Sequence, residues 1–290
     1  MSKWLANGTL DHLRDVAEWP DLGPRYEVKG RLGRGGMGAV FEAYDRTLDR
    51  EVAVKVMDHA GGEARVLAHL EHPGIVPVHD SGTLPDGRVF YVMKRVRGAR
   101  LNEALSPDTS IAQRLDLFLR VCDSVAFAHA QGVVHRDLKP ENVMLGAFGE
   151  VLVMDWGIAT TLGGQPSGTV VAGTPGFMAP EQAREDATTD ARTDVFALGA
   201  LLEAMLPWPV PRPLAAIARH ARAHEPSGRY ATVEAMAKDV ERFRDGEPVD
   251  AYRENLFERI VRIYARYRVP IILVLVYMVV RVILLLWVRV

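Results

Sequence analysis

A short interval of the sequence, VVHRDLKPENVML at residues 133–145, concentrates side chains that could transfer a phosphoryl group. Asp137 could accept the proton of an attacking hydroxyl, and Lys139 could neutralise the charge of the phosphate being transferred. Asn142 offers an amide oxygen to a metal ion, and Pro140 stiffens the turn between them. Because apolar residues flank the interval on both sides, we expect a catalytic loop between two buried strands. The alternative is a polar surface turn.

A glycine-rich stretch, LGRGGMGAV at residues 32–40, could close over a phosphate-bearing ligand. Gly33, Gly35 and Gly38 form a G-x-G-x-x-G pattern, which on its own also occurs in ordinary turns between strands. Here the pattern lies between two strand-like runs and not between a strand and a helix. That position argues against a dinucleotide site and favours a hairpin whose backbone covers phosphates.

A lysine stands inside a run of apolar, β-branched residues. Lys55 belongs to VAVKV, and a functional lysine in such a strand needs a carboxylate partner to stay charged and oriented. Glu63, at the start of EARVLAHL, is the natural candidate. The alternatives are a lysine that points outward from an edge strand and a glutamate favoured by the dipole at the start of a helix.

Strand-like and helix-like segments occupy different parts of the chain. Residues 26–96 contain short β-prone runs separated by Gly, Asp and Pro, with one helical pattern among them. Later segments repeat apolar residues at helical spacing, and Gly132 stands where the first long helix would end. We therefore expect an α+β protein with lobes at about 26–96 and 97–246 and a cleft between them. Residues 1–25 are expected to be an extension with a helix around 9–18.

Composition limits the class of protein and its compartment. With 290 residues, 48% hydrophobic and 25% charged, the chain is long enough for one or two globular domains. Its formal net charge of −2 argues against a general binder of nucleic acid. Cys122 is the single cysteine, so no intramolecular disulfide can form. Its apolar helical surroundings favour a buried, unreactive thiol.

An apolar segment near the C-terminus has the composition of a membrane span. Residues 269–288, VPIILVLVYMVVRVILLLWV, contain one charged side chain, Arg281. A helix of this length would extend about 30 Å, the thickness of the hydrocarbon layer of a bilayer. We therefore expect a single-pass transmembrane helix that anchors the chain in the cell membrane by its tail. The alternative is a buried core helix.

The preceding segment, residues 247–268, is expected to be juxtamembrane. Its charged residues near the span are mostly basic, with Arg253, Arg259, Arg262, Arg266 and Arg268 against Glu254 and Glu258. Such an excess favours the cytoplasmic side of a membrane, so we expect the two lobes to be cytoplasmic. A homodimer through the tail or the first lobe is left open.

Three further motifs contain acidic residues in settings that suit a function. VMDWG places Asp155 at a strand end, as expected of a magnesium ligand. GTPGFMAPE ends at Glu181. TDVFALG places Asp194 on an apolar helix, where a carboxylate needs hydrogen-bond donors.

Taken in order, the motifs between residue 26 and about residue 246 resemble those of the protein kinase family, and most closely the bacterial eukaryotic-like Ser/Thr kinases. Lys139, two residues after Asp137, matches the Ser/Thr pattern and not the Tyr pattern. The resemblance implies a bilobal kinase fold, ATP with Mg²⁺ or Mn²⁺ as cofactors, and proteins as substrates.

The resemblance also implies a role for each matching residue. The catalytic residues would be Asp137, Lys139, Lys55 and Asn142. The metal ion would be held by Asn142 and Asp155. The nucleotide would contact Leu32, Gly33, Gly35, Gly36, Gly38, Val40, Ala53, Lys55, Glu63, Met93, Val96, Leu145 and Asp155, with Met93 as gatekeeper before the hinge and Glu63 as partner of Lys55.

Four supporting interactions are implied as well. Thr174 would bond towards Asp137 and Lys139. Glu181 would pair with Arg229, and Asp194 would brace the backbone of the catalytic loop. The side chains that would stack as a hydrophobic spine between the lobes are Leu67, His135 and Trp156.

The chain departs from the family pattern at three places. Lys55 and Glu63 are separated by a short connection, MDHAGG, in place of a longer one. Trp156 replaces the usual phenylalanine of the D-x-G motif. LLEAMLPWPVPRPLAAIARHA passes directly from one helix to another where relatives insert a loop and a helix, which puts the docking of peptide substrates in doubt.

The segment between Asp155 and Glu181 is glycine-rich and carries several hydroxyls. We expect Thr169, and less strongly Ser167, to be autophosphorylated, with the added charge pairing with Arg136. The alternative is an ordinary polar loop.

Two hypotheses compete. The favoured one is a membrane-anchored Ser/Thr protein kinase of the non-specific class, and the alternative is a pseudokinase that acts as a nucleotide-binding scaffold. A small-molecule phosphotransferase is disfavoured by GTPGFMAPEQA.

Overall fold

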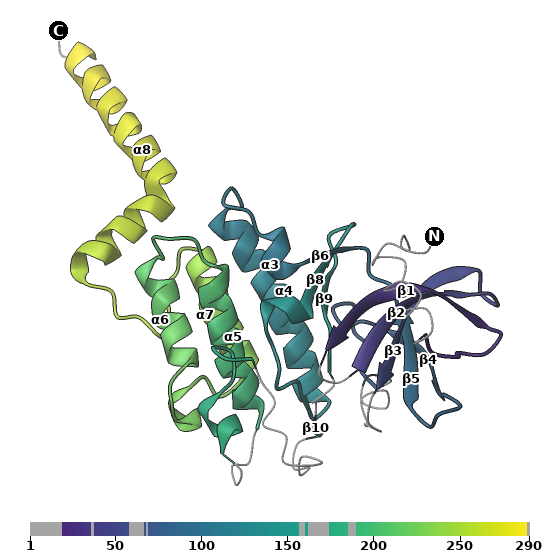
Figure 1. Cartoon of the computed structure of the whole chain (residues 1–290). Helices are drawn as coiled ribbons and strands as arrows, with labels where there is room; N and C mark the ends of the chain where they lie inside the picture. The colour runs from purple at the N-terminus through teal and green to yellow at the C-terminus, as the bar shows by residue number, and fades with distance from the viewer. Residues whose placement is uncertain are drawn as a thin grey trace, which may run out of the picture.

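The computed structural model describes residues 19–35, 38–57, 67, 69–156, 160–161, 174–184 and 190–288. These residues form a first lobe that is rich in strands and a second lobe that is mostly helical. A long helix leaves the second lobe at the C-terminal end of the chain (Figure 1). The two-lobed α+β architecture expected from the sequence is confirmed.

The first lobe is an antiparallel sheet of five strands in the order β1-β2-β3-β5-β4. The strands are β1 (Tyr26–Gly35), β2 (Gly38–Asp45), β3 (Arg50–Met57), β4 (Val78–Thr83) and β5 (Val89–Lys94). β3 lies at the centre of the sheet, and its valine-rich sequence, REVAVKVM, suits a strand buried on both faces.

The two faces of β3 contribute to different parts of the core. Val52, Val54 and Val56 belong to a cluster confined to the first lobe. Ala53 and Met57 belong to the large core that the first lobe shares with the second. Because side chains alternate along a strand, Lys55 lies on the same face as Ala53 and Met57 and is directed towards the second lobe.

The second lobe is built on helices that pack around α5 and α4. The helices are α3 (Leu101–Ala104), α4 (Ile111–Ala130), α5 (Ala191–Met205), α6 (Arg212–Ala221) and α7 (Val233–Arg244). α5 is buried along most of its length, because its sequence ARTDVFALGALLEAM is apolar on nearly every side. It therefore forms the central support of this lobe.

Local sequence signals fix the ends of α4. The Ser110 hydroxyl accepts a hydrogen bond from the Gln113 amide at 3.3 Å, which caps the first turn. Gly132 follows the helix with φ of +75°, a left-handed conformation that glycine adopts without a steric penalty. The predicted helix end at Gly132 is confirmed.

Short strands hold the loop that carries the HRDLKPEN motif. β7 (Val133–Val134) pairs with β10 (Thr160–Thr161), while β8 (Val143–Gly146) lies between β6 (Gly98–Arg100) and β9 (Val151–Val153). The 3₁₀ turn η1 (Pro140–Asn142) leads into β8. The loop lies between two strands, as predicted, but only β7 is buried throughout, whereas in β8 only Val143 is buried.

Two further 3₁₀ turns shape the second lobe, η2 (Pro180–Ala183) and η3 (Pro226–Gly228). Residues 206–211 connect α5 directly to α6, as the sequence predicts, and Trp208 in this connection is almost fully exposed.

At the N-terminal end, the helix expected around residues 9–18 lies outside the described residues. Trp19 and Leu22 pack against the cluster of the first lobe, and Arg25 forms an ion pair with Asp45 at 2.9 Å. The last residues of the expected extension are therefore packed onto the sheet.

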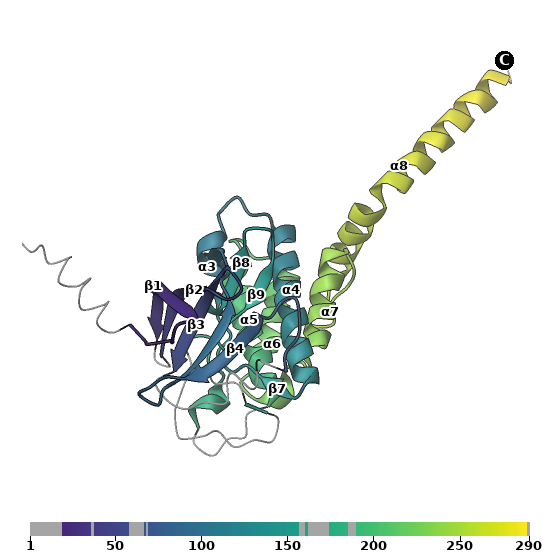
Figure 2. The same cartoon turned by 90° about the vertical axis from the view of Figure 1, so that its right-hand side faces the viewer.

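The C-terminal helix α8 (Leu256–Val288) is bent. Tyr267 has non-helical dihedral angles, φ −108° and ψ 15°, and Pro270 lies shortly after it. The segments Leu256–Tyr264 and Val269–Leu285 meet at 74°. Figures 1 and 2 show the second segment projecting away from both lobes.

The expected single transmembrane helix over residues 269–288 is not shown. Among the described residues, no unbroken helix is both long and apolar enough to cross a bilayer. The two segments of α8 reach that length and composition only when they are counted together across their bend.

Candidate active site

A lysine of the first lobe and an aspartate of the second lobe form an ion pair between the lobes. Lys55 Nζ lies 3.0 Å from Asp155 Oδ1, although the two residues are far apart in the sequence. The lysine side chain is 5% exposed, whereas the aspartate stays half exposed. The predicted meeting of these two side chains is thus observed.

The charge of Asp155 is set by its surroundings. Partial burial by itself would raise the pKa of this carboxyl, but the charge and hydrogen bond of Lys55 outweigh that effect and hold the pKa below its ordinary value. Asp155 is therefore ionised at neutral pH. It lies two residues after the end of β9 and has φ of +59°, a backbone conformation that is uncommon for a residue other than glycine.

Asp137 lies at the centre of a polar cluster in the catalytic loop. Its Oδ2 accepts hydrogen bonds from Lys139 Nζ at 2.7 Å and from Asn142 Nδ2 at 3.1 Å. Lys139 Nζ also donates to Thr174 Oγ1 at 2.8 Å, and that hydroxyl lies 3.4 Å from Asp137 Oδ1. The contacts expected of Thr174 are therefore present.

The orientation of Asn142 bears on whether a metal ion fits here. Its amide nitrogen donates to the backbone carbonyl of Asp137 at 2.8 Å as well as to the carboxylate. The amide oxygen is thus the atom left for a cation. Asn142 and the ionised Asp155 would supply two oxygens, and Mg²⁺ characteristically takes one or two protein oxygens together with phosphate and water. The donor set fits Mg²⁺ or Mn²⁺.

The backbone of the catalytic loop is held by a buried carboxylate on α5. Asp194 accepts hydrogen bonds from the amides of His135 and Arg136, each at 2.8 Å. His129 on α4 contacts the same carboxylate at 2.7 Å. Burial would raise the pKa of Asp194, but these bonds and the nearby histidines hold it low. The bracing role expected of Asp194 is observed.

The glycine-rich stretch forms the hairpin that the sequence predicts. Gly35 pairs with Gly38 and Gly33 pairs with Val40 across β1 and β2. Gly38 has φ of +138°, and a Cβ there would lie 2.0 Å from the carbonyl oxygen of Val56. Only glycine fits this position. Gly36 lies outside the described residues, and Leu32 is an exposed residue of β1.

The residues expected around the adenine ring border one apolar region. Ala53 faces Met93 across β3 and β5, and both are buried in the shared core. Val40, Val96 and Leu145 are partly buried and pack against the same core. Ala53 also lies two residues from Lys55 on the same face of β3, so an apolar surface adjoins a charged group here, a combination found in ligand sites.

The predicted spine between the lobes is observed in part. The rings of His135 and Trp156 contact each other with their centroids 4.5 Å apart and their planes tilted by 48°. Trp156 is fully buried, so the core accommodates the larger ring at this position. Leu67 is buried in the same core. Glu63 lies outside the described residues, so its pairing with Lys55 stays a prediction.

Glu181 of η2 and Arg229, which directly follows η3, form the expected ion pair. Arg229 donates from two nitrogens to the two carboxylate oxygens, both at 2.7 Å. It also donates to three backbone carbonyls, those of Ala223, Arg192 and His224. Burial would raise the pKa of Glu181, but the hydrogen bond and charge of Arg229 hold it below its usual range.

Two residues of the site were missed in the sequence. His129 reaches Asp194 from α4, and Gln182 donates from Nε2 to the backbone carbonyl of Arg136 at 2.8 Å. The distance of these two residues from the loop in the sequence does not predict either contact. The sequence shows only that His129 lies in the last turn of a helix before Gly132 and that Gln182 follows Glu181.

The hairpin, the ion pair between the lobes and the loop held by Asp194 together form a two-lobed fold of the protein-kinase type. The family described as protein kinase domain matches residues 26–238. The chain belongs to this family.

Several bacterial kinases are similar in sequence. Serine/threonine-protein kinase PknD of Chlamydia felis is 30% identical over a region that covers 77% of this chain and 31% of that protein. Serine/threonine-protein kinase PknB of Mycobacterium leprae is 34% identical, with 80% and 45% covered. PknB of Mycolicibacterium smegmatis is 36% identical, with 79% and 44% covered. The chain spans less than half the length of these relatives.

Proposed function

We propose that the chain is a Ser/Thr protein kinase that transfers the γ-phosphoryl group of ATP to serine and threonine hydroxyls of proteins. The observation that carries the proposal is the contact of Lys55 with Asp155 beside the polar cluster of the loop, whose members are Asp137, Lys139 and Asn142. The two groups are connected by a hydrogen bond from the Met154 amide to the Asn142 carbonyl at 2.8 Å. Phosphoryl transfer depends on positioning and charge neutralisation, and these side chains supply both.

Each residue has a defined task in this reaction. Asp137 accepts the proton of the attacking hydroxyl, because its carboxylate is the group at the centre of the loop. Lys139 stands beside it and neutralises the transferring phosphate, while its bond to Thr174 fixes its position. Asn142 and Asp155 would hold the metal ion, which would neutralise negative charge on the phosphates. Lys55 orients the nucleotide from the opposite lobe.

The test is incubation of the purified chain with radiolabelled ATP, Mg²⁺ and generic protein substrates. We expect label on serine and threonine and loss of transfer when EDTA removes the metal ion. Transfer should return when Mg²⁺ or Mn²⁺ is added in excess. Nucleotide binding without transfer under any metal condition would instead identify a pseudokinase, and label on tyrosine alone would contradict the substrate class.

The kinase also phosphorylates its own activation loop at Thr169 or Ser167, two residues that lie outside the described residues. Support comes from Arg136, whose Nε is buried and has no hydrogen-bond partner among the described residues. Burial lowers the pKa of this guanidinium. A phosphate nearby would supply the missing acceptor and the missing negative charge.

Mass spectrometry after incubation with Mg-ATP tests this loop. We expect phosphate on Thr169 or Ser167 in the wild type and none in a catalytically inactive Asp137→Asn chain. If the wild-type chain phosphorylates other proteins but carries no phosphate on Thr169 or Ser167, the proposed autophosphorylation is wrong.

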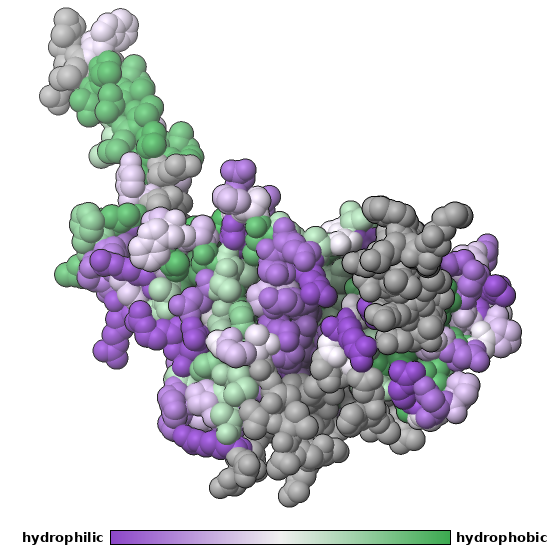
Figure 3. Space-filling model, viewed as in Figure 1, coloured by the Kyte–Doolittle hydropathy of each residue, from purple (hydrophilic) through white to green (hydrophobic). Residues whose placement is uncertain are grey.

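The chain is further proposed to be tethered to the cytoplasmic face of a membrane by residues 269–288. Large apolar side chains cover this segment without contact to either lobe, and Figure 3 shows the continuous hydrophobic surface that results. Burying such a surface in a bilayer is favourable, and the arginines before it favour a cytoplasmic kinase domain.

Deletion of residues 269–290 should move the chain from the membrane fraction to the soluble fraction of a cell lysate. Transfer activity of the shortened chain should persist, because the deleted residues do not contribute to the cleft. Replacement of 269–288 by an unrelated apolar span should restore the membrane fraction. An unchanged distribution after the deletion would refute the tether.

A further inference from the structure

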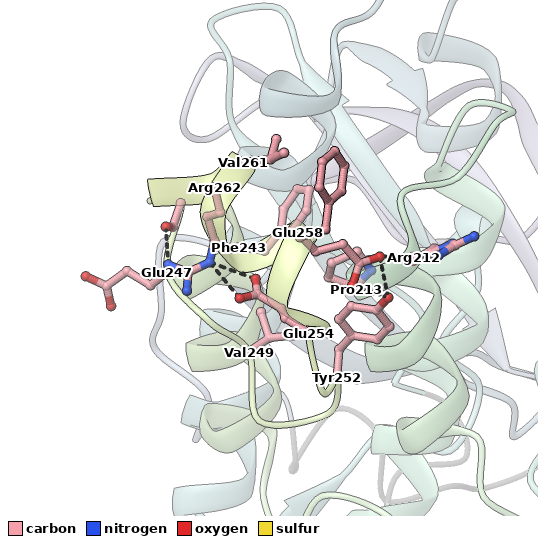
Figure 4. A pocket seen from close by; sticks show the side chains of 12 residues that line it. Arg212, Pro213, Phe243, Glu247, Val249, Tyr252, Glu254, Glu258, Val261 and Arg262 are labelled. Carbon is pink, nitrogen blue, oxygen red and sulfur yellow. Dashed lines mark hydrogen bonds and ion pairs between the residues drawn. The ribbon is translucent and has the colours of Figure 1, made fainter. Parts of the chain in front are cut away.

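The first segment of α8 carries its apolar residues along one broad side of the helix, and Glu258 and Arg262 on the other side. At one edge of the apolar side, Phe257 and Val261 line a cavity of about 420 Å³ together with Phe243, Val249 and Tyr252 (Figure 4). Phe257 and Val261 nevertheless stay 73% and 49% exposed. The contact of this segment with the second lobe therefore depends mainly on its polar side.

Ion pairs and hydrogen bonds hold the polar side of this segment against the second lobe. Glu258 accepts from Arg212 of α6 at 3.2 Å and from the Tyr252 hydroxyl at 2.9 Å. Arg262 pairs with Glu254 at 2.7 Å and donates to the backbone carbonyl of Gly246 at 3.2 Å, just after α7. These contacts, which we call the clamp, hold the segment in one orientation relative to α6 and α7.

The side of the helix away from the clamp presents an apolar stripe, which we call the outer stripe. It consists of side chains that are between 40% and 80% exposed, namely Leu256, Ile260, Ile263, Tyr264 and Tyr267. Their helical spacing places them on one side of the helix, opposite Glu258 and Arg262. An amphipathic helix with such an exposed face is characteristic of segments that lie in a bilayer interface.

The neighbouring residues indicate what covers the stripe. It continues into the apolar second segment of α8, and the two segments meet at 74°. If the second segment stands upright in a bilayer, the first therefore lies nearly flat on its surface. Arg253 and Arg259 are exposed and have no ion-pair partner among the described residues, so anionic headgroups suit them.

The position of the lobes is compatible with that arrangement. Figures 1 and 2 both show the two lobes on the side of the first segment away from the second segment. A flat bilayer around the second segment would therefore meet the outer stripe without meeting the sheet of the first lobe.

We propose that residues 256–267 form an interfacial helix, which lies in the headgroup region of an anionic bilayer and, through the clamp, sets the orientation of the kinase domain on the membrane. This proposal rests on the proposed tether and adds a second, surface-bound contact to it.

The single cysteine allows a direct test. Cys122 is buried, so a thiol-reactive fluorophore will label an introduced exposed cysteine selectively. Three full-length variants are reconstituted in vesicles of phosphatidylglycerol and phosphatidylcholine that carry nitroxide lipids at known depths. Ile260→Cys reports on the stripe and Val276→Cys on the second segment. Leu48→Cys, an exposed aliphatic position on the first lobe, is the matched control.

We expect the label at position 260 to lie roughly 5–10 Å below the headgroup surface and the label at position 276 to lie deeper. The label at position 48 should not be quenched by the nitroxide lipids. Quenching at 276 but not at 260 would refute the interfacial helix and leave the tether intact. No quenching at 276 would refute the tether as well. Retained transfer activity in each labelled variant shows that the chain is folded.

The charge and clamp parts of the proposal have their own readouts. In vesicles of phosphatidylcholine alone, the label at 260 should be quenched less than in the anionic vesicles, and equal quenching would exclude a role for anionic headgroups. Energy transfer from position 48 to acceptor lipids should change when Glu258→Ala and Arg262→Ala remove the clamp. Unchanged transfer would show that the clamp does not set orientation.

Discussion

We expect Asp137→Asn to lower the rate of phosphoryl transfer by about 10²–10⁴-fold, the range that a general base contributes. Asparagine has nearly the same shape, and its amide oxygen can still accept the hydrogen bonds from Lys139 and Asn142. It cannot accept the proton of the attacking hydroxyl. The affinity for nucleotide should change little, because Asp137 is not among the residues proposed to contact the nucleotide. Those residues lie in the glycine-rich hairpin, at Lys55 and in the apolar region around Ala53.

The measurement is transfer of radiolabel to a generic protein substrate, together with binding of a fluorescent ATP analogue. Asp108→Asn is a matched control, because it removes an acidic charge from an exposed loop of the same lobe. The control should transfer like the wild type. Full activity of Asp137→Asn would remove the residue from the mechanism, and a parallel loss of nucleotide binding would indicate misfolding.

The second large effect concerns stability. We expect Arg229→Met to lower the free energy of unfolding by about 3–5 kcal/mol, the cost of breaking a buried ion pair by removing one partner. Glu181 would keep a buried charge, and three backbone carbonyls would lose their donor. Because each unpaired buried group carries a desolvation penalty, the loss should exceed that of any exposed pair.

Chemical unfolding followed by tryptophan fluorescence measures this change. The double variant Glu181→Met with Arg229→Met should recover part of the lost stability, because no buried charge then remains unpaired. Arg244→Met, which removes an exposed pair with Asp116, is the matched control and should cost much less. Equal effects of Arg229→Met and Arg244→Met would contradict the role given to the buried pair.

The chemistry-bearing residues could be predicted from the sequence because their types and spacing are themselves required by the reaction. Asp137, Lys139 and Asn142 lie within one short loop, so their proximity is decided locally. The meeting of Lys55 with Asp155 was predicted only through the resemblance to a family, since nothing in their spacing brings a central strand to a distant turn.

The unpredicted parts depend on tertiary contacts or on backbone geometry. Gln182 and His129 reach the loop from other elements, so their role emerges only after folding. The break of α8 had a local cause that was overlooked. Pro270 cannot donate a helical hydrogen bond, and its ring clashes with the carbonyl four residues earlier, so a kink near Tyr267 follows.

The catalytic loop contains a residue in a conformation that would be unfavourable in isolation. Arg136 has φ of +70°, and its amide is bound by Asp194, which belongs to the buried helix α5. The conformation of the loop therefore depends on the folded state of α5, and the loop should lose this conformation when α5 unfolds. Inactivation on heating should therefore coincide with melting of the entire second lobe, without an earlier local step at the catalytic centre.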